Sequence, residues 1–325
     1  MEEVIIAGLG KYTPSHLVTN DQLSELIDTS DEWIYSRTGI KSRYISTGED
    51  TSHMAAKAGE KALKNANISP LDVDLIVVAT CTPDMFTPST ACIVQSIIGA
   101  KNAMAFDISA ACSGFIYGLD VAKSMMKLNN YNHALVIGAE NLSKSIDWED
   151  RSTCVLFGDG AGAALLSKSD NLGLVSSFCK SEGDKYKCIT IEGNDVDSPF
   201  VESKTIKHSK LKMDGSEVFK FATSVIVSSI SKILEENNLD INEIDYIIPH
   251  QANVRIIQYA AKKLKITMDK FYMNMEEYGN TSGASIPIAL SDMNEKGLLK
   301  KDSKIILVGF GAGLTYGATL INWTM

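Results

Sequence analysis

The sequence has no long hydrophobic run and no excess of positive charge. None of its apolar stretches approaches the roughly 18 residues that a membrane-spanning helix requires. Acidic residues outnumber basic ones by 40 to 31, and the net charge of −9 argues against a surface committed to nucleic acid or an anionic membrane. The first residues, Met-Glu-Glu-Val-Ile-Ile, are acidic and strand-like, unlike a signal peptide. We therefore expect a soluble, cytoplasmic protein without nucleic-acid or membrane partners.

Metal-binding and paired-thiol patterns are also missing. None of the six cysteines forms a CxxC pair, and no two of the five histidines have the spacing of zinc ligands. We expect no metal site. A free cysteine usually behaves as a small buried hydrophobic residue, so a reactive role needs separate evidence for each one.

Apolar runs of strand length alternate with longer helical patterns. A helix is predicted over residues 216–237, with Asp214 as its N-terminal cap. Buried strands are predicted at residues 75–79, 134–138, 246–248 and 304–308. This alternation indicates an α/β fold with largely buried sheets.

Landmarks in the two halves of the chain recur at one common offset. The matched pairs are Asp74 and Asp245, Gly138 and Gly309, and Cys112 and Gly283. Short β-runs can match by chance, but a shared offset favours an internal duplication. We expect two halves, residues 1–170 and 171–325, joined near the polar stretch 167–171.

Residues 180–212 fit neither half. The segment is polar and irregular, with lysines at positions 204, 207, 210 and 212. A loop of this length inside a compact chain is usually functional or mobile. A solvated insertion is the alternative interpretation.

Cys112 is the first candidate for chemistry. It follows a short apolar entry and a run of small residues, and a helical pattern through Tyr117, Leu119, Val121 and Met125 comes next. This order places Cys112 at a strand-to-helix turn, where the helix dipole and free N–H groups are expected to lower the thiol pKa and hold an oxyanion. The ordinary alternative is a buried structural thiol.

Two further segments offer partners for such a nucleophile. His250 ends the predicted strand at 246–249, and ligands bind beyond the carboxyl ends of strands in α/β sheets. Asn280 lies in residues 278–285, which on their own would be read as a glycine-flanked helix cap; its amide can donate a hydrogen bond without titrating. The glycine-rich residues 309–313 can offer backbone N–H groups as an oxyanion hole, and they lack the ending of a phosphate loop.

These segments carry a family resemblance. "DISAACSGF", "PHQANVRI" and "YGNTSGAS", in this order and at these separations, resemble the Cys-His-Asn triad of β-ketoacyl-acyl carrier protein synthase III. The similarity covers essentially the whole chain, including "TSDEWIYSRTGI" and "FGDGAGAALL". Chain-elongating relatives have a second His where Asn280 stands, and thiolases have a second active-site Cys late in the chain, whereas no cysteine here lies beyond Cys188. Chalcone-type synthases share the triad but not the contexts of Trp33 and "HQAN".

The resemblance implies a thiolase-like fold, with duplicated halves in five layers α/β/α/β/α, and a homodimer. It implies that an acyl-CoA acylates Cys112, after which malonyl-acyl carrier protein loses CO2 and attacks the thioester to give a 3-oxoacyl product. His250 and Asn280 would hold the malonyl thioester oxygen, and the N–H groups of Cys112 and Ala312 would hold the oxyanion. No metal or redox cofactor is implied.

The same comparison suggests the substrate-binding residues. Trp33 and Arg151 match the pair that sandwiches the adenine of CoA, and Arg37 matches a phosphate contact. Residues matching the pantetheine path are Thr29, Met213, Phe219 and Asn253. The acidic carrier protein is expected to dock on a basic patch formed by Lys220, Arg255, Lys262 and Lys263, although a charge run is ordinarily just a solvated face.

One departure concerns the acyl pocket. Thr87 stands before Pro88, where several acetyl-selective relatives carry an aromatic ring, so a deeper pocket for branched or longer primers is expected unless Phe86 fills the space. The leading interpretation is an enzyme that initiates fatty acid synthesis. The alternatives are a starter-condensing ketosynthase of a polyketide or quinolone pathway and a catalytically idle CoA- or carrier-binding protein. The intact set of Cys112, His250 and Asn280 speaks against the idle protein.

Overall fold

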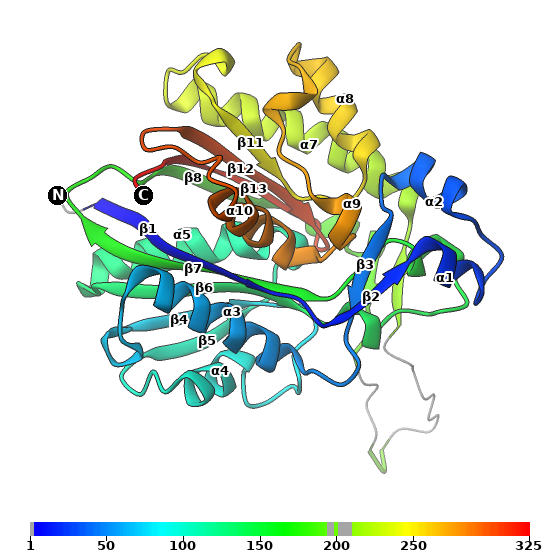
Figure 1. Cartoon of the computed structure of the whole chain (residues 1–325), viewed down its shortest axis with the longest axis horizontal. Helices are drawn as coiled ribbons and strands as arrows, with labels where there is room; N and C mark the ends of the chain where they lie inside the picture. Colours follow the sequence, from blue (N-terminus) through cyan, green and yellow to red (C-terminus); the bar gives the residue numbers. More distant parts are fainter. Residues whose placement is uncertain (1–2, 194–197, 201–209) are drawn as a thin grey trace.

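Two β-sheets, each covered by helices, form the body of the molecule (Figure 1). The computed structural model of the chain describes residues 3–193, 198–200 and 210–325. The first sheet has the order β1-β7-β6-β4-β5, with β4 parallel to β5 and β6 and with β7 antiparallel to β6 and β1. Its strands are β1 (Glu3–Tyr12), β4 (Leu75–Ala79), β5 (Met104–Ile108), β6 (His133–Glu140) and β7 (Gly160–Ser169).

The second sheet has the order β11-β12-β13-β8, in which only the β11–β12 pair is parallel. Its strands are β8 (Leu174–Ser181), β11 (Tyr246–Pro249), β12 (Lys304–Gly311) and β13 (Thr315–Asn322). The four predicted strands correspond to β4, β6, β11 and β12, so those predictions are confirmed. Each is buried because helices cover both faces of its sheet.

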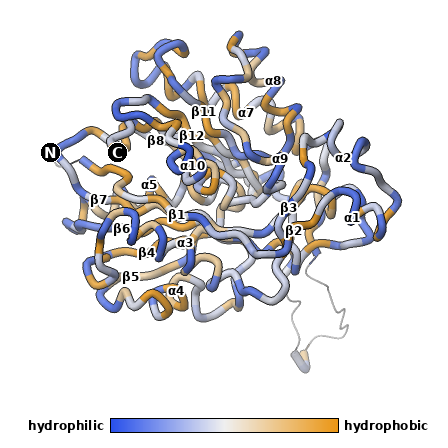
Figure 2. The backbone as a smooth tube through the Cα atoms, viewed as in Figure 1, coloured by the Kyte–Doolittle hydropathy of each residue, from blue (hydrophilic) through white to orange (hydrophobic). Residues whose placement is uncertain are grey.

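Helices and sheets stack in five layers (Figure 1). The outer face of the first sheet carries α3 (Thr51–Ala66) and α4 (Thr90–Ile98), and that of the second sheet carries α7 (Gly215–Glu236) and α8 (Val254–Leu264). Between the sheets lie α5 (Gly114–Asn129) and α10 (Ser285–Glu295). Three apolar clusters fill the spaces between these layers, and Figure 2 shows the hydrophobic segments running through the strands and the inner helices. The predicted α/β/α/β/α architecture is confirmed.

The longest helix begins as its sequence predicts. It was expected over 216–237 and spans Gly215–Glu236. The Asp214 side chain accepts hydrogen bonds from the backbone N–H groups of Ser216 and Glu217, so Asp214 is the N-terminal cap.

The turns that precede the two central helices have the same backbone form. Ala111 opens the 3-10 turn η2 (Ala111–Ser113) with φ 45°, and Ser282 opens η7 (Ser282–Ala284) with φ 48°. A Cβ atom on Gly138 of β6 would lie 2.2 Å from the Gly283 carbonyl oxygen, so one half's strand packs directly against the other half's turn. The strands of the first sheet end at residue 169 and those of the second begin at residue 174. These features support the predicted duplication, and the boundary near residue 170 stays a prediction.

The described part of the segment at 180–212 contains regular secondary structure. It contains β9 (Ile189–Ile191), which pairs antiparallel with β10 (Leu211–Met213), and the turn η4 (Gly183–Cys188). Of its lysines, positions 204 and 207 lie outside the described residues. Lys210 donates to the Ile146 carbonyl at 2.7 Å, and Lys212 lies 3.5 Å from Glu192.

Shorter elements complete the chain. The two-stranded sheet of β2 (His16–Thr19) and β3 (Ser42–Ile45) carries α1 (Asn20–Ser24) and α2 (Asp31–Thr38) between its strands. The remaining short helices are α6 (Arg151–Cys154) and α9 (Met275–Tyr278), with 3-10 turns η1 (Pro70–Asp72), η3 (Leu142–Lys144), η5 (Ile241–Glu243) and η6 (Met268–Lys270). No helix within the described ranges is both long enough and apolar enough to cross a membrane.

Candidate active site

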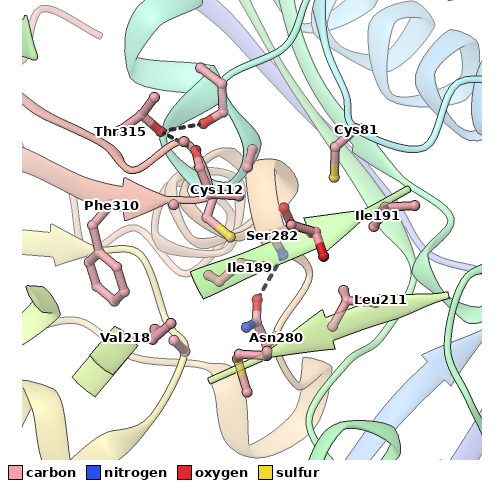
Figure 3. A pocket seen from close by; sticks show the side chains of 18 of the residues that line it. Cys81, Cys112, Ile189, Ile191, Leu211, Val218, Asn280, Ser282, Phe310 and Thr315 are labelled. Atoms are coloured by element: carbon pink, nitrogen blue, oxygen red, sulfur yellow. Dashed lines mark hydrogen bonds between the residues drawn. The ribbon is translucent and has the colours of Figure 1, made fainter. Parts of the chain in front are cut away.

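A cavity of about 420 Å³ is lined by Cys112, His250 and Asn280. Figure 3 shows Cys112 and Asn280 in its wall. Cys112 follows the carboxyl end of β5, and His250 follows that of β11. The other walls are largely apolar and include Leu142, Phe157, Ile189, Ile191, Leu211, Val218 and Phe310. β9 and β10, from the segment predicted to be a loop, therefore form part of the cavity. Such a site can hold an apolar chain next to a thiol.

Cys112 occupies the predicted strand-to-helix turn. It lies in η2, immediately before α5, and follows the left-handed Ala111. The end of β12 packs closely against it, because a Cβ atom on Gly311 would lie 2.6 Å from the Cys112 nitrogen. Only glycine permits this approach of the late loop to Cys112.

The expected lowering of the Cys112 pKa is wrong. Burial, together with a smaller contribution from the nearby Glu140 carboxylate, raises the pKa of the thiol to about 12. A hydrogen bond with Ser282 and the backbone N–H of Cys112 itself lower the pKa, but they do not offset the loss of hydration. The Cys112 side chain is thus a neutral thiol near neutral pH.

His250 is a buried, neutral imidazole. It is 2% exposed, and its backbone N–H donates to the Val308 carbonyl at 2.7 Å. Its Nδ1 atom lies 2.8 Å from Ser285 Oγ, and its ring meets that of Phe310 edge-on with centroids 5.2 Å apart. Burial lowers the pKa of His250 to about 3, so the ring carries no charge near neutral pH.

Asn280 is held in one orientation. It is 5% exposed, and its Oδ1 atom accepts the backbone N–H of Ser282 at 2.9 Å (Figure 3). Its own backbone N–H donates to the Leu156 carbonyl at 2.8 Å, and its carbonyl accepts the N–H of Gly158 at 3.0 Å. Because Oδ1 is engaged, the Nδ2 group is the part of the amide left for a ligand in the cavity.

The sequence interpretation missed Glu140, which lies beside the cavity. It is fully buried at the end of β6 and accepts hydrogen bonds from Thr82 Oγ1 at 2.7 Å, Ser282 Oγ at 3.0 Å and the Cys81 backbone N–H at 3.1 Å. Burial raises its pKa, and these donors oppose that shift. The signal was present in the sequence: an acidic residue ends the apolar run "LVIGAE".

Hydroxyl groups connect the late glycine loop to the turn that contains Cys112. Thr315 Oγ1 lies 3.0 Å from the Ala110 carbonyl and 2.9 Å from the Ala312 carbonyl, and Ser113 Oγ donates to it at 2.7 Å. Ala312 and Cys112 both line the cavity. The two backbone segments predicted to hold an oxyanion are therefore adjacent.

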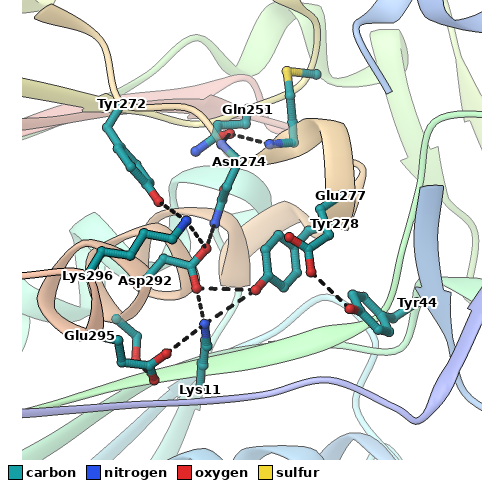
Figure 4. A network of polar contacts seen from close by, with 12 residues as sticks. Lys11, Tyr44, Gln251, Tyr272, Asn274, Glu277, Tyr278, Asp292, Glu295 and Lys296 are labelled. Carbon is teal, nitrogen blue, oxygen red and sulfur yellow. Dashed lines mark hydrogen bonds and ion pairs between the residues drawn. The ribbon is translucent and has the colours of Figure 1, made fainter. Parts of the chain in front are cut away.

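Gln251 joins the His250 strand end to the segment before Asn280 (Figure 4). Its Oε1 atom accepts the backbone N–H groups of Asn274 at 2.7 Å and Met275 at 2.8 Å. These are the residues that open α9, which leads directly into the Asn280 turn.

A buried carboxylate holds the same segment from the other side (Figure 4). Asp292 of α10 is 2% exposed; it forms an ion pair with Lys11 and accepts hydrogen bonds from Asn274 Nδ2 at 2.7 Å and Tyr278 OH at 3.2 Å. Several donors compensate the cost of burying this charge.

The predicted adenine pair is already in contact. The guanidinium groups of Arg37 and Arg151 lie 4.6 Å and 4.7 Å from the centre of the Trp33 ring, and Arg151 also donates to the Asp28 carbonyl at 2.7 Å. An adenine base stacked between Trp33 and Arg151 needs a separation of about 7 Å between the ring and the guanidinium group, because each of its two contacts takes ~3.5 Å. Arg151 must therefore move before adenine can be sandwiched there.

The predicted pantetheine residues are spread out. Met213 lines the cavity, whereas Thr29, Phe219 and Asn253 do not. Phe219 is 37% exposed on α7, and Asn253 caps α8 by accepting the Arg255 N–H at 2.9 Å. The hydroxyl of Thr29 is buried and has no hydrogen-bond partner in the described part of the chain.

The predicted carrier-docking residues are all exposed on the packed pair α7 and α8. Lys262 and Lys263 lie in the last turn of α8. Arg255 donates to the Ser36 carbonyl at 3.0 Å, and Lys220 forms an ion pair with Glu217 at 2.7 Å, which reduces its free charge.

Thr87 is not brought into the cavity. It is exposed in the loop between β4 and α4, and Phe86 beside it is 79% exposed. Neither residue is part of the cavity wall of its own chain.

No group of three His, Cys, Asp or Glu side chains suited to a metal ion occurs within the described ranges.

Comparisons with known proteins agree with this geometry. The family model described as 3-Oxoacyl-[acyl-carrier-protein (ACP)] synthase III matches residues 106–183, and the model of the C-terminal part of that family matches residues 234–323. The chain is 56% identical over 323 residues to Beta-ketoacyl-[acyl-carrier-protein] synthase III of Clostridium novyi, covering 99% of this chain and 100% of the relative.

Two solved structures have nearly the same fold. The 3-oxoacyl-[acyl-carrier-protein] synthase III of Aquifex aeolicus superposes with a TM-score of 0.92 and 44% identity, covering 98% of this chain and 100% of that one. The priming β-ketosynthase of the R1128 polyketide pathway superposes with a TM-score of 0.92 and 33% identity, covering 99% and 96%.

Proposed function

The chain belongs to the 3-oxoacyl-[acyl-carrier-protein] synthase III family, and we propose that it joins an acyl-CoA primer to malonyl-acyl carrier protein to initiate fatty acid synthesis. Members of this family are condensing acyltransferases, and this chain is one of them. The observation that carries the proposal is the convergence of Cys112, His250 and Asn280 on one apolar cavity.

In the first stage, the Cys112 sulfur attacks the thioester carbon of the acyl-CoA. A new S–C bond forms, the bond from carbon to the CoA sulfur breaks, and the proton of the thiol leaves with CoA as its new thiol. The negative charge on the carbonyl oxygen is held by the backbone N–H groups of Cys112 and Ala312, which the packing of Gly311 brings together.

In the second stage, the malonyl thioester loses CO2 and the electron pair of the broken C–C bond forms an enolate. Asn280 Nδ2 and the neutral His250 ring donate hydrogen bonds to the enolate oxygen. Fixed neutral donors suit this task, because they stabilise developing charge in a water-poor site without having to reorganise. The enolate carbon then attacks the acyl-Cys112 carbonyl, and the thiolate of Cys112 leaves and is reprotonated.

The binding residues complete the proposal. Trp33, Arg37 and Arg151 bind the nucleotide end of CoA, with Thr29, Met213, Phe219 and Asn253 along the pantetheine path. Lys220, Arg255, Lys262 and Lys263 dock the acidic carrier protein. Neither stage requires a metal or redox cofactor. We propose a cytoplasmic location, which suits these substrates.

A homodimer is supported by the free edge of the first sheet. Within the described ranges, β5 pairs with β4 alone, and an unpaired, apolar strand edge favours association. Exposed apolar side chains on and near this edge include Met104 at 51%, Ile97 at 47% and Met85 at 48%. Thr87 lies in the loop next to them, so a second chain is the means by which it reaches an acyl pocket.

Intact-mass spectrometry after incubation with a panel of acyl-CoAs tests the proposal. We expect a single acyl adduct on Cys112, no adduct in Cys112→Ala, and a retained adduct in Cys81→Ala, which removes the other cavity-lining thiol. The acylated enzyme is then given malonyl-acyl carrier protein, and release of a 3-oxoacyl product is measured. An adduct that survives in Cys112→Ala, or an acyl-enzyme that never condenses, would disprove the assignment.

A starter-condensing ketosynthase of a polyketide or quinolone pathway is the second candidate. It is favoured by the similarity to the R1128 priming β-ketosynthase, which uses nearly the same fold. The two functions are separated by the carrier protein: faster condensation with a polyketide carrier than with the fatty acid carrier supports the second.

A further inference from the structure

The protonation of His250 decides what the proposed second stage can do. A neutral imidazole carries one N–H, and the other nitrogen is an acceptor. Holding an enolate oxygen requires a donor, so the nitrogen that faces the substrate has to carry the hydrogen. His250 is 2% exposed, so the protein around the ring, rather than water, sets this choice.

The partner of the ring is the hydroxyl of Ser285. Its Oγ atom lies 2.8 Å from Nδ1, and Ser285, also 2% exposed, is the first residue of α10. Within the described ranges this is the only hydrogen bond of that hydroxyl. Nδ1 is thus taken by the protein, and Nε2 is the nitrogen left for the cavity that His250 lines.

Counting hydrogens assigns the direction of this bond. If Nδ1 carried the hydrogen, Ser285 would accept it, and the buried hydroxyl hydrogen would have no acceptor in the described part of the chain. If Ser285 donates, its hydrogen is satisfied and the ring hydrogen lies on Nε2. A buried donor without a partner is costly, so the second arrangement is favoured.

We propose that Ser285 is a positioning residue whose hydroxyl donates to Nδ1 of His250 and thereby keeps the hydrogen of the ring on Nε2. The catalytic consequence rests on the proposed function: Nε2–H is then the group that donates to the enolate oxygen. The edge-on contact with Phe310, at 5.2 Å between ring centres, holds the ring in the plane that this hydrogen bond requires.

The duplication supports a dedicated role for this hydroxyl. The residue at the matching position of the first half is Gly114, which opens α5 as Ser285 opens α10. A Cβ atom on Gly114 would lie 2.9 Å from the Cβ of Ala79. The shared turn therefore forms without a hydroxyl, and only the half that contains His250 has one.

Nitrogen NMR of the whole protein, labelled with 15N-histidine, tests the assignment directly. The His250 signals are identified by their loss in His250→Gln. We expect a non-protonated, hydrogen-bonded Nδ1 and a protonated Nε2 near neutral pH. A protonated Nδ1 in the unmodified protein overturns the proposal, whatever the activity.

The matched variants are Ser285→Ala and Ser285→Thr. In Ser285→Ala we expect mixed tautomers and a fall of about tenfold or more in the kcat for malonyl decarboxylation, which is part of the roughly 100- to 10,000-fold that a positioned proton donor supplies. Acylation of Cys112 should stay near the wild-type rate, and Ser285→Thr should restore both the tautomer and decarboxylation. Unchanged tautomer and decarboxylation in Ser285→Ala would also overturn the proposal. If the signals are as expected but no form decarboxylates malonyl thioesters, the proposed function fails while the assignment of Ser285 stands.

Discussion

The side-chain oxygen of Asn280 accepts the backbone N–H of Ser282 at 2.9 Å, and Ser282 itself adopts a left-handed backbone with φ 48°. A non-glycine residue in this region is strained, and the hydrogen bond from Ser282 Oγ to Glu140 at 3.0 Å helps to hold it there. Glu140, Ser282 and Asn280 therefore form a chain from a buried carboxylate to the amide that faces the cavity. This chain determines which end of the Asn280 amide meets a ligand.

Replacing Asn280 by Asp tests that orientation. Asn280→Asp keeps an acceptor for Ser282 but removes the Nδ2 donor and adds a negative charge beside the enolate. We expect malonyl decarboxylation to fall by about 100-fold or more, the usual effect of losing an oxyanion donor. Release of CO2 from malonyl-acyl carrier protein measures this step, and mass spectrometry follows acylation of Cys112, which should be largely retained. Asn129→Asp, at the exposed end of α5, is the matched control. Wild-type decarboxylation in Asn280→Asp would show that Nδ2 is not the donor.

Alkylation of Cys112 should depend steeply on pH. Because burial raises the thiol pKa to about 12, the reactive thiolate fraction keeps increasing where an ordinary thiol would level off near its pKa of 9. We expect the rate with iodoacetamide to rise about tenfold per pH unit up to about pH 10, without a plateau. The Cys81→Ala background removes the other thiol of the cavity. A plateau below pH 9 would contradict a raised pKa.

Trp33 should act on the binding of acyl-CoA and not on the chemistry. Removing a stacking partner of a base costs about 1–3 kcal/mol, so Trp33→Ala should raise the KM for acyl-CoA by about tenfold or more with little change in kcat. Initial-rate kinetics of acylation measure both. Tyr35→Ala is the control, because this residue lies on the same helix, is 42% exposed and stacks with Lys41 instead. Equal KM values for the two variants would remove Trp33 from the CoA site.

Asp292 should matter for stability. Asp292→Ala leaves the Asn274 Nδ2 and Tyr278 OH groups without this acceptor and removes the buried partner of Lys11, which then keeps the exposed Glu295. Removing one partner of a buried ion pair costs about 3–5 kcal/mol. Denaturant unfolding at fixed protein concentration measures the change. The control is Glu295→Ala, which removes the other acidic partner of Lys11. The Glu295 side chain is 57% exposed, so its loss should lower the free energy of unfolding by less than about 1 kcal/mol. If the two variants lost equal free energy of unfolding, burial would not explain how much Asp292 contributes to stability.

Local patterns in the sequence were sufficient for much of the fold. The strands β4, β6, β11 and β12, the helix α7 and its Asp214 cap were predicted from periodicity and capping, because both depend on residues close in the chain. The turn at Cys112 was predicted for the same reason. The common offset in the chain also indicated the matching turn at Ser282, which the structure shows with the same left-handed backbone.

The order of the elements and the positions of Cys112, His250 and Asn280 at their ends therefore follow from local sequence patterns. Three features depend on the folded chain: the raised pKa of Cys112, the place of Thr87 outside the cavity, and the hydrogen bonds between Glu140 and Ser282 and between Ser285 and His250. The reason is that desolvation and hydrogen bonding depend on atoms from segments far apart in the chain. No local pattern records how many of those atoms surround a given group.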